Sequence, residues 1–323
     1  MKNVLRIVAA LVFVLTSTRG AFPAEPHWPS SLTIGTASPG GTYYAYGEGL
    51  ARILTRALGI AVDMRPTEGP GQNIVLLEGG EIQIAFVTLG AALQAWNGTA
   101  AGAEGKQLRA MRAIFPMYDT PFQFMVLQNS GIRTLSELGG KRVGVGPHGG
   151  TGGTYIPQFF KTLNIDATLI YGDWADLATQ VQNRTIDALA VAAGVPFPSL
   201  AEIERREKVH YLPLTPSQII DLRLAIPELG PSLVSAGSYP SLLRHYATVG
   251  LYNFAVVHRD LPDDLVYAIV DAVFANHEQM MEVHPAAAET IPSNFTRNTF
   301  LPFHSGASRW YHHRGVVGTM RAD

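Results

Sequence analysis

The chain has 323 residues, of which 47% are hydrophobic and 15% charged, so it can bury a large core and is not a disordered protein. Its 24 Lys and Arg residues and 26 Asp and Glu residues give a net charge of −2, which excludes the basic surplus of proteins that bind nucleic acid or anionic lipid. Cysteine is absent, which excludes disulfide bonds, thiolate metal sites and a thiol nucleophile.

Residues 1–24 have the pattern of a secretory signal peptide. Lys2 and Arg6 precede nine unbroken apolar residues, Ile7 to Leu15, and small residues follow up to Ala24. The apolar run is too short to span a bilayer. Cleavage after Gly20 and cleavage after Ala24 both stay open. We therefore expect a mature protein that is exported to the periplasm.

The first informative stretch is a glycine-rich loop between a strand at Leu32 to Ile34 and a helix that starts at Tyr43. Gly40 and Gly41 allow a tight turn and a close approach of a ligand to the backbone. The N–H groups at the start of the helix can hold an anion, although turn chemistry alone is the alternative reading. The candidate ligand contacts here are Ser38, Gly41, Thr42, Tyr43 and Tyr44.

The pattern then alternates between strands and helices. We predict strands at 60–64 and 82–87 and short helices at 72–77 and 89–96, which together favour a parallel sheet covered by helices. Two apolar runs follow, at 108–115 and 122–127. Pro116 and Pro121 lie between them, so we predict two separate strands, the second of which crosses between lobes.

A second unit of the same kind follows. A strand at 142–145 leads into another glycine-rich loop, Gly146 to Thr154, and then into a helix from Tyr155 to Leu163. Strands at 168–171 and 186–192 alternate with helices that follow Asp173 and begin at Pro198. A long apolar run, Thr248 to Val257, is the predicted return strand.

The longest helix is predicted with Asp260 as its N-cap residue and Pro262 in its first turn, and it ends near Val283. With no low-complexity linker in the chain, we predict two interleaved lobes joined by crossing strands. Lobe 1 comprises 31–121 and 258–323, lobe 2 comprises 126–247, and the crossing segments are 122–125 and 248–257.

Two glycine loops, each between a strand and a helix, can face each other across a cleft between the lobes. An anion is then held by two helix N-termini without a charged side chain. The chain has no GxSxG or HExxH motif, and adjacent His312 and His313 point in different directions on a helix, so we expect no catalytic residue, no metal site and no cofactor. We interpret Trp174 as a residue of the core or of the cleft wall.

The chain resembles the TAXI family, the extracytoplasmic solute receptors of tripartite ATP-independent periplasmic (TRAP) transporters. Matching segments occur in order along nearly the whole mature chain. They are Ile34-Gly35-Thr36, Gly40 to Tyr44, Leu77 to Gly80, Asn97-Gly98-Thr99, Leu138 to Val143, Thr151-Gly152, Ile186-Asp187-Ala188, Gly194-Val195-Pro196, Ala236 to Tyr239, Leu261 to Tyr267 and His304 to Ala307.

The resemblance implies a two-lobe α/β fold of the periplasmic-binding-protein type with a central ligand cleft. It implies a monomeric receptor that captures a small carboxylate, such as a glutamate-like amino acid or a 2-oxoacid, and passes it to a TRAP-type membrane permease. The further ligand contacts that it implies are Thr88, Leu89, Thr151, Gly152, Thr154, Gly194, Val195, Pro196 and Tyr239.

Three segments depart from the family pattern. Thr88-Leu89-Gly90 stands in place of Gln-Ser-Asp, Phe115-Pro116-Met117 stands in place of Tyr-Pro-Glu, and Gly150 to Thr154 lengthens the second loop. Two polar or charged groups are thereby lost, which leaves the ligand class open because an unpaired polar group is unfavourable in a closed cleft. A periplasmic sensor for a membrane kinase and an enzyme on the same fold are the alternative functions.

Overall fold

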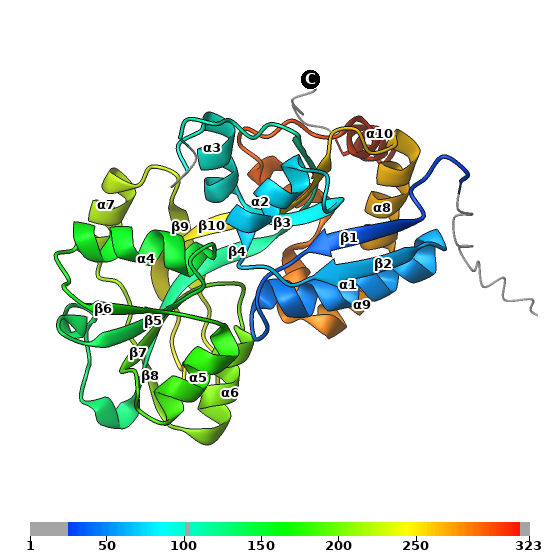
Figure 1. The fold of residues 1–323 in the computed structure, drawn as a ribbon. Coiled ribbons are helices and arrows are strands. Elements are labelled where there is room, and N and C mark those ends of the chain that lie inside the picture. The colour runs from blue at the N-terminus through cyan, green and yellow to red at the C-terminus, as the bar shows by residue number, and fades with distance from the viewer. Residues whose placement is uncertain (1–24, 101–103, 317–323) are drawn as a thin grey trace, which may run out of the picture.

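The computed structural model describes residues 25–100 and 104–316, which form two α/β lobes side by side (Figure 1). The predicted α/β fold with two lobes is confirmed. We call lobe 1 the part that contains the first and last described residues, and lobe 2 the part built from the middle of the chain. The predicted signal peptide, residues 1–24, lies outside the described residues.

The strands form one extended arrangement with the order β2-β1-β3-β10-β4-β7-β5-β6, in which β8 also pairs with β4 and β9 with β10. β10 pairs with β3 in lobe 1 and β4 pairs with β7 in lobe 2, so these two antiparallel strands run between the lobes. The strands are β1 Ser31–Gly35, β2 Ala61–Arg65, β3 Ile84–Thr88, β4 Met111–Leu127, β5 Arg142–Gly146, β6 Thr168–Tyr171, β7 Ala188–Ala192, β8 Val209–Tyr211, β9 Gly230–Val234 and β10 Tyr246–His258.

The prediction of two strands separated by Pro116 and Pro121 was wrong, because β4 is one strand that includes both prolines. Its pairing with β7 begins only at Phe122, so the stretch before that residue has a paired strand on its β10 side alone. A proline, which lacks an N–H, is tolerated where one edge of a strand is unpaired.

Helices cover both faces of the sheet in each lobe (Figure 1). The α-helices of lobe 1 are α1 Thr42–Leu58, α2 Pro70–Glu78, α3 Leu89–Asn97, α8 Asp263–Ala275, α9 His277–Val283 and α10 Ser305–His313. Those of lobe 2 are α4 Thr151–Thr162, α5 Trp174–Gln182, α6 Pro198–Arg206 and α7 Pro216–Ala225. Short 3₁₀ helices span Gln128–Ser130, Leu135–Leu138, Pro285–Glu289 and Pro292–Arg297.

Two predicted helices differ from the structure. α4 begins at Thr151, four residues before the predicted start, because the second glycine loop continues directly into the first turn. The longest predicted helix is two helices: α8 ends at Ala275 and α9 starts at His277, with a break at Asn276. The N-cap residue of α8 is Pro262, not Asp260, and the Asn276 side chain donates to the carbonyl oxygen of Ala272 where α8 ends.

Each lobe has its own hydrophobic core. In lobe 1 the fully buried side chains of α1, such as Leu50 and Leu54, belong to one cluster with Phe86 of β3 and Val256 of β10. In lobe 2 the sheet separates two clusters, one around Phe159 and one around Leu177. Two independent cores connected by two strands allow the lobes to move as separate bodies.

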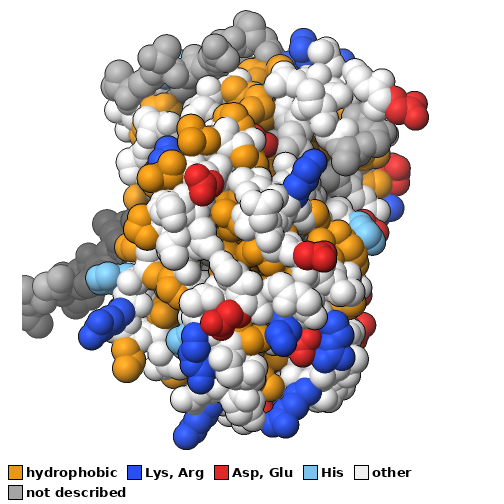
Figure 2. Space-filling view, turned by 90° about the vertical axis from the view of Figure 1, so that its left-hand side faces the viewer, with side chains coloured by type: hydrophobic (Ala, Val, Ile, Leu, Met, Phe, Trp, Pro, Cys, Tyr) orange, Lys and Arg blue, Asp and Glu red, His pale blue; other side chains and the backbone are white. Residues whose placement is uncertain are grey.

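Within the described residues, none of the helices is both long enough and apolar enough to cross a membrane. Figure 2 views the molecule from the lobe 2 side. Basic side chains gather toward the lower end of this face with acidic side chains between them, and apolar side chains are scattered over the remainder. On α6, for example, Glu202 forms ion pairs with both Arg205 and Arg206.

Candidate functional site

The first part of the candidate site is the start of α1. The chain leaves β1 and turns at Gly40, whose φ of +83° is a left-handed conformation that favours glycine. Gly41 is the N-cap residue and has no side chain to cap the helix, so the first N–H groups of α1 have no partner within the helix. The positive end of the helix dipole is therefore presented to the cleft with these donors.

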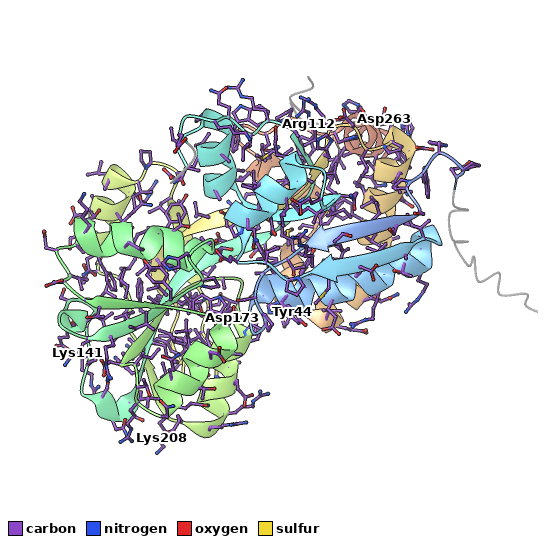
Figure 3. All side chains as sticks on the ribbon, in the orientation of Figure 1. Tyr44, Arg112, Lys141, Asp173, Lys208 and Asp263 are labelled. Atoms are coloured by element: carbon purple, nitrogen blue, oxygen red, sulfur yellow. The ribbon has the colours of Figure 1, made fainter. Side chains whose placement is uncertain are left out.

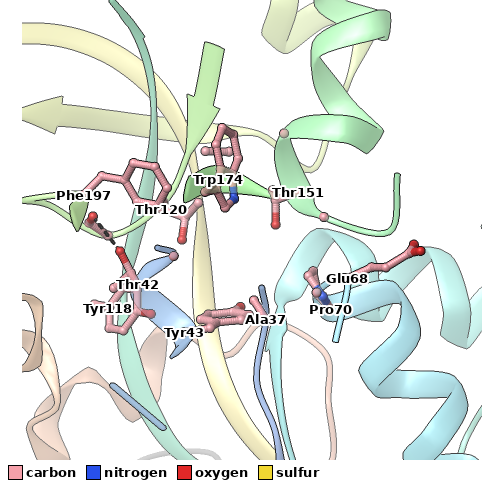
Figure 4. A pocket seen from close by; sticks show the side chains of 17 residues that line it. Ala37, Thr42, Tyr43, Glu68, Pro70, Tyr118, Thr120, Thr151, Trp174 and Phe197 are labelled. Carbon is pink, nitrogen blue, oxygen red and sulfur yellow. Dashed lines mark hydrogen bonds between the residues drawn. The ribbon is translucent and has the colours of Figure 1, made fainter. Parts of the chain in front are cut away.

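The second part is the start of α4 in lobe 2. Gly150 is the N-cap residue, again without a side-chain cap, and Thr151 is the first helical residue. The Thr151 hydroxyl makes no hydrogen bond with the described residues, and it points into the pocket in Figure 4. In the same helical turn, the Thr154 hydroxyl instead donates to the carbonyl oxygen of Gly150 over 2.9 Å.

Three more helices begin at the same place. α2 follows Gly69, α5 follows Asp173 and α6 follows Phe197, and none of these N-cap residues makes a side-chain cap hydrogen bond. Together with α1 and α4, five helix N-termini meet at one pocket between the lobes. Their dipoles create a positive potential there without a Lys or Arg side chain.

The pocket lies between the two lobes (Figure 4). Its cavity has a volume of about 40 Å³, which is room for a few water molecules and well below the roughly 300–1,000 Å³ of ordinary ligand pockets. The lining residues are Ala37, Gly41, Thr42, Tyr43, Glu68, Gly69, Pro70, Tyr118, Thr120, Gly150, Thr151, Gly152, Trp174, Ala192, Ala193, Gly194 and Phe197.

The cavity is small because the lobes touch across the cleft. The Thr42 hydroxyl donates to the carbonyl oxygen of Gly194 over 3.0 Å, and the Ser199 hydroxyl donates to the carbonyl oxygen of Gly40 over 2.9 Å. On the other side, the N–H of Gly149 donates to a carboxylate oxygen of Glu68 over 3.0 Å. A ligand larger than a few waters therefore enters only when the lobes separate.

A second set of contacts joins the lobes beyond the pocket. The side-chain amide of Gln94 on α3 donates to Glu228 over 2.8 Å and to the hydroxyl of Tyr155 over 3.2 Å. His284 accepts the N–H of Ala286 at Nδ1, so its Nε2–H donates to the carbonyl oxygen of Pro196 over 2.9 Å. Burial lowers the pKa of His284, partly offset by this carbonyl, which favours the neutral ring.

The polar side chains of the lining carry hydroxyl groups, one indole N–H and one carboxylate. Glu68 is the lining residue with a formal charge, and its carboxylate is exposed at the pocket edge and held by Gly149. The cations Arg112, Lys141 and Lys208 lie at the far ends of the molecule, away from the pocket (Figure 3). Burial raises the pKa of Tyr43 well above its ordinary value, and its hydroxyl is neutral and donates to Asn253 over 2.6 Å.

Six of the fourteen residues that the sequence indicates as ligand contacts line this pocket: Gly41, Thr42, Tyr43, Thr151, Gly152 and Gly194. They come from the two glycine loops and from the segment after β7. The structure thus brings together the two helix starts on which the anion hypothesis depends.

The other eight residues lie outside the lining. Ser38 is buried with an unpartnered hydroxyl, Tyr44 is half-buried at the boundary between the lobes (Figure 3), and Thr88 caps α3 by accepting the N–H of Ala91. Val195 and Leu89 line two separate surface hollows, at the hinge and beside α3. Thr154 and Pro196 make the hydrogen bonds described above, and Tyr239 is fully buried.

Tyr239 contacts the pocket through an intermediate residue. Its hydroxyl accepts the backbone N–H of Phe197 over 2.7 Å and donates to the side-chain oxygen of Gln123 over 2.7 Å. The amide group of Gln123 in turn donates to the carbonyl oxygen of Ala193 over 3.1 Å. Tyr239 and Gln123 therefore hold both ends of the segment from Ala193 to Phe197, which forms one wall of the pocket.

Sequence reasoning placed Trp174 in the core or the cleft wall but missed Phe197, Tyr118 and Thr120 in the wall of the pocket. Trp174 and Phe197 pack edge to face, with ring centroids 5.1 Å apart, and Tyr118 and Thr120 line the pocket from β4. Trp174 directly follows the loop after β6, and Phe197 follows the end of β7. The signal for them was their place after the carboxyl ends of parallel strands, where ligands bind in open α/β sheets.

Comparisons with known proteins agree with this architecture. The model of the NMT1-like family matches residues 34–315. The chain is similar in structure to malate-bound MatC of Rhodopseudomonas palustris, with 12% identity, a TM-score of 0.60, and coverage of 88% of this chain and 99% of that one. The chain is also similar to a periplasmic transporter, with 13% identity, a TM-score of 0.57, and coverage of 91% of this chain and 97% of that one. An ancestral arginine-binding protein bound to arginine matches with 14% identity, a TM-score of 0.50, and coverage of 80% of this chain and 98% of that one. At these identities the likeness shows the fold alone.

Proposed function

We propose that this chain, which belongs to the NMT1-like family, is an extracytoplasmic solute receptor that captures a small carboxylate between its lobes. Within that family, the ordered motifs from Ile34 to Ala307 favour the TAXI receptors, which deliver their ligand to a TRAP-type membrane permease. The periplasmic location, a monomeric state and the absence of catalysis belong to the same proposal. The malate bound to MatC is consistent with a carboxylate as ligand.

The observation that carries the proposal is the meeting of five uncapped helix N-termini at one pocket. Each helix start presents the positive end of a dipole, and the first turns of α1, α4 and α5, which contain no proline, also supply N–H donors; such ends bind anions. Thr151 adds a hydroxyl that makes no hydrogen bond with the described residues. A carboxylate accepts several of these hydrogen bonds at once, and each hydrogen bond to a charged group contributes about 1.5–3 kcal/mol.

In the mechanism that we propose, one lobe binds first and the other completes the site. A carboxylate enters the open cleft and meets the start of α4, where Thr151 and the N–H groups of its first turn donate to it. The lobes then close about β4 and β10, which brings α1 and Thr42 onto the ligand. Closure of this hinge type presents a defined surface to a membrane partner only when ligand is bound.

Mass spectrometry of the small molecules that co-purify with the mature protein tests the ligand class directly. A small carboxylate is the expected finding, and its readdition should raise the melting temperature by mass action, corresponding to about 2.7 kcal/mol at a hundredfold excess over Kd. A thermal-shift response restricted to sugars or cations would contradict the proposal. A gene for a large multi-span permease beside this one supports delivery, whereas a gene for a membrane kinase supports a sensor instead.

A further inference from the structure

Trp174 is held firmly at the pocket by both lobes. Its ring packs edge to face on Phe197, and it lies against Gly146, where an added Cβ would come within 2.4 Å of the ring. From lobe 1, Gly41 lies beside the ring, at a distance where an added Cβ would be in ordinary van der Waals contact with Cδ1 of the indole, 3.5 Å away. The glycine at position 146 thus leaves a space that this ring fills, and the orientation of the ring is fixed by packing.

The polar atom of Trp174 faces the pocket. The side chain is 7% exposed, and its indole N–H makes no hydrogen bond with the described residues. In Figure 4 the indole nitrogen and the Thr151 hydroxyl face the same space. An indole N–H is a donor only, and it loses contact with water once a ligand fills the closed pocket, so the ligand has to supply the acceptor.

Three acceptors around the pocket already have partners, whereas the Tyr118 hydroxyl in the lining has none among the described residues. The carbonyl oxygen of Gly194 accepts from Thr42, that of Ala193 accepts from Gln123, and the carboxylate of Glu68 accepts from Gly149. An ammonium group is, like the indole N–H, a donor only. Next to Trp174 it would face another donor, whereas a carbonyl or hydroxyl oxygen would accept the indole N–H.

We propose that Trp174 is a specificity-determining residue whose indole N–H donates to the oxygen on C2 of the ligand, so that the receptor selects 2-oxoacids and 2-hydroxyacids over amino acids. This inference rests on the proposed function, because it takes the carboxylate of the ligand to be held by Thr151 and the helix starts. The inference assigns the second polar contact of the ligand. It also decides between 2-oxoacids or 2-hydroxyacids and amino acids, since the carboxylate site alone permits both classes.

Calorimetry with two triplets of ligands tests the assignment. One triplet is pyruvate, propanoate and L-alanine, and the other is 2-oxo-3-methylbutanoate, 3-methylbutanoate and L-valine, so that within a triplet only the group on C2 changes. We expect the 2-oxoacid to bind most tightly and the amino acid most weakly. Trp174→Phe should weaken binding of the 2-oxoacid by about three- to tenfold more than binding of the plain carboxylate, the effect of one neutral hydrogen bond.

A second measurement is made on the wild-type protein, and Trp174→Phe serves only to identify the Trp174 signal. The chain contains four tryptophans, so the indole N–H region of a nitrogen–proton correlation spectrum holds four signals at most, one of which Trp174→Phe removes. That signal should shift on addition of the 2-oxoacid and much less on addition of the plain carboxylate. Equal shifts with both, an equal loss of affinity for both, or tight binding of the amino acid would overturn this inference alone. Binding of none of the six would overturn the proposed function as well.

Discussion

The hydroxyl of Thr42 and the carbonyl oxygen of Gly194 lie 3.0 Å apart, and this hydrogen bond joins lobe 1 to lobe 2 at the pocket. The two residues fit because Gly194 has no side chain: an added Cβ would lie 2.7 Å from the ring of Tyr118 and 2.9 Å from the methyl group of Thr42. The contact therefore depends on a glycine in one lobe and a threonine in the other.

Thr42→Val should shift the protein toward an open form, because valine keeps the shape of threonine and loses the donor. The loss of one neutral hydrogen bond corresponds to about 0.5–1.5 kcal/mol, so ligand affinity should fall by up to about tenfold. Small-angle scattering should show a larger radius of gyration than for the wild type. Thr42→Ser retains the donor and should behave like the wild type. Equal dimensions for all three proteins would show that this bond does not control closure.

Thr151→Ala should weaken ligand binding more than tenfold, because it removes a donor to a charged group, an interaction that contributes about 1.5–3 kcal/mol. The melting temperature of the ligand-free protein should change little, since Gly150, not Thr151, is the N-cap residue of α4. Thr154→Ala is the matched control from the same helical turn, whose hydroxyl bonds to the backbone instead. If the two variants lose affinity equally, Thr151 has no special contact with the ligand.

Tyr239→Phe should destabilise the protein by about 1–3 kcal/mol, because the buried N–H of Phe197 and the amide of Gln123 lose their partner. Since this partner positions the wall of the pocket, ligand affinity should fall as well. Tyr211 stacks on Tyr239 with ring centroids 5.0 Å apart, but its buried hydroxyl has no partner among the described residues. Denaturant unfolding should therefore show no loss of unfolding free energy for Tyr211→Phe. If Tyr211→Phe lost as much stability as Tyr239→Phe, the positioning role of Tyr239 would be refuted.

Glu289 should make the protein less stable as the pH rises toward neutrality. Burial, together with the nearby charge of Asp119, raises the pKa of Glu289 from 4.5 to about 7, partly offset by the Asp119 backbone N–H and Arg297. The folded protein then holds this proton more tightly than the unfolded chain does. The contribution of Glu289 to the free energy of unfolding is fully present below about pH 4.5 and is lost as the pH rises through about 7. The slope of this loss is at most about 1.4 kcal/mol per pH unit.

Melting temperatures measured between about pH 5 and 8 test this linkage. The wild type should lose stability over this range, whereas Glu289→Gln, which cannot ionise, should follow a flatter profile. Glu282→Gln, on the exposed face of α9, is the control and should retain the wild-type slope. A parallel profile for the wild type and Glu289→Gln would show that Glu289 does not titrate in this range.

The sequence predicts the elements of this fold well where short-range pattern decides them. The strand, glycine loop and helix around Gly41 follow from local composition, because an apolar run, turn residues and a helical spacing all agree there. The start of α4 was placed too late, since Gly152 and Gly153 have poor helix propensity and only their packing in lobe 2 makes that turn helical. Likewise, Pro116 was read as a strand break because the sequence does not show which edge of β4 is paired.

The site itself was only partly predictable. Thr42 and Thr151 belong to visible glycine loops, and the idea that the loops face each other places both in one pocket. Trp174 and Phe197 carry no local motif, and they reach the pocket because β6 and β7 end at the same edge of the lobe 2 sheet. That edge is a product of strand order, which depends on contacts between residues far apart in the chain.

The position of β10 between β3 and β4 has a consequence for biosynthesis. β10 ends at His258, and until that residue has left the ribosome the lobe 1 sheet lacks a central strand. The facing edges of β3 and β4 meanwhile have unpaired backbone groups, a state prone to pairing with other chains. Contacts of such long sequence separation also slow folding. The N-terminal half of this chain therefore keeps two unpaired strand edges for longer than its own length suggests.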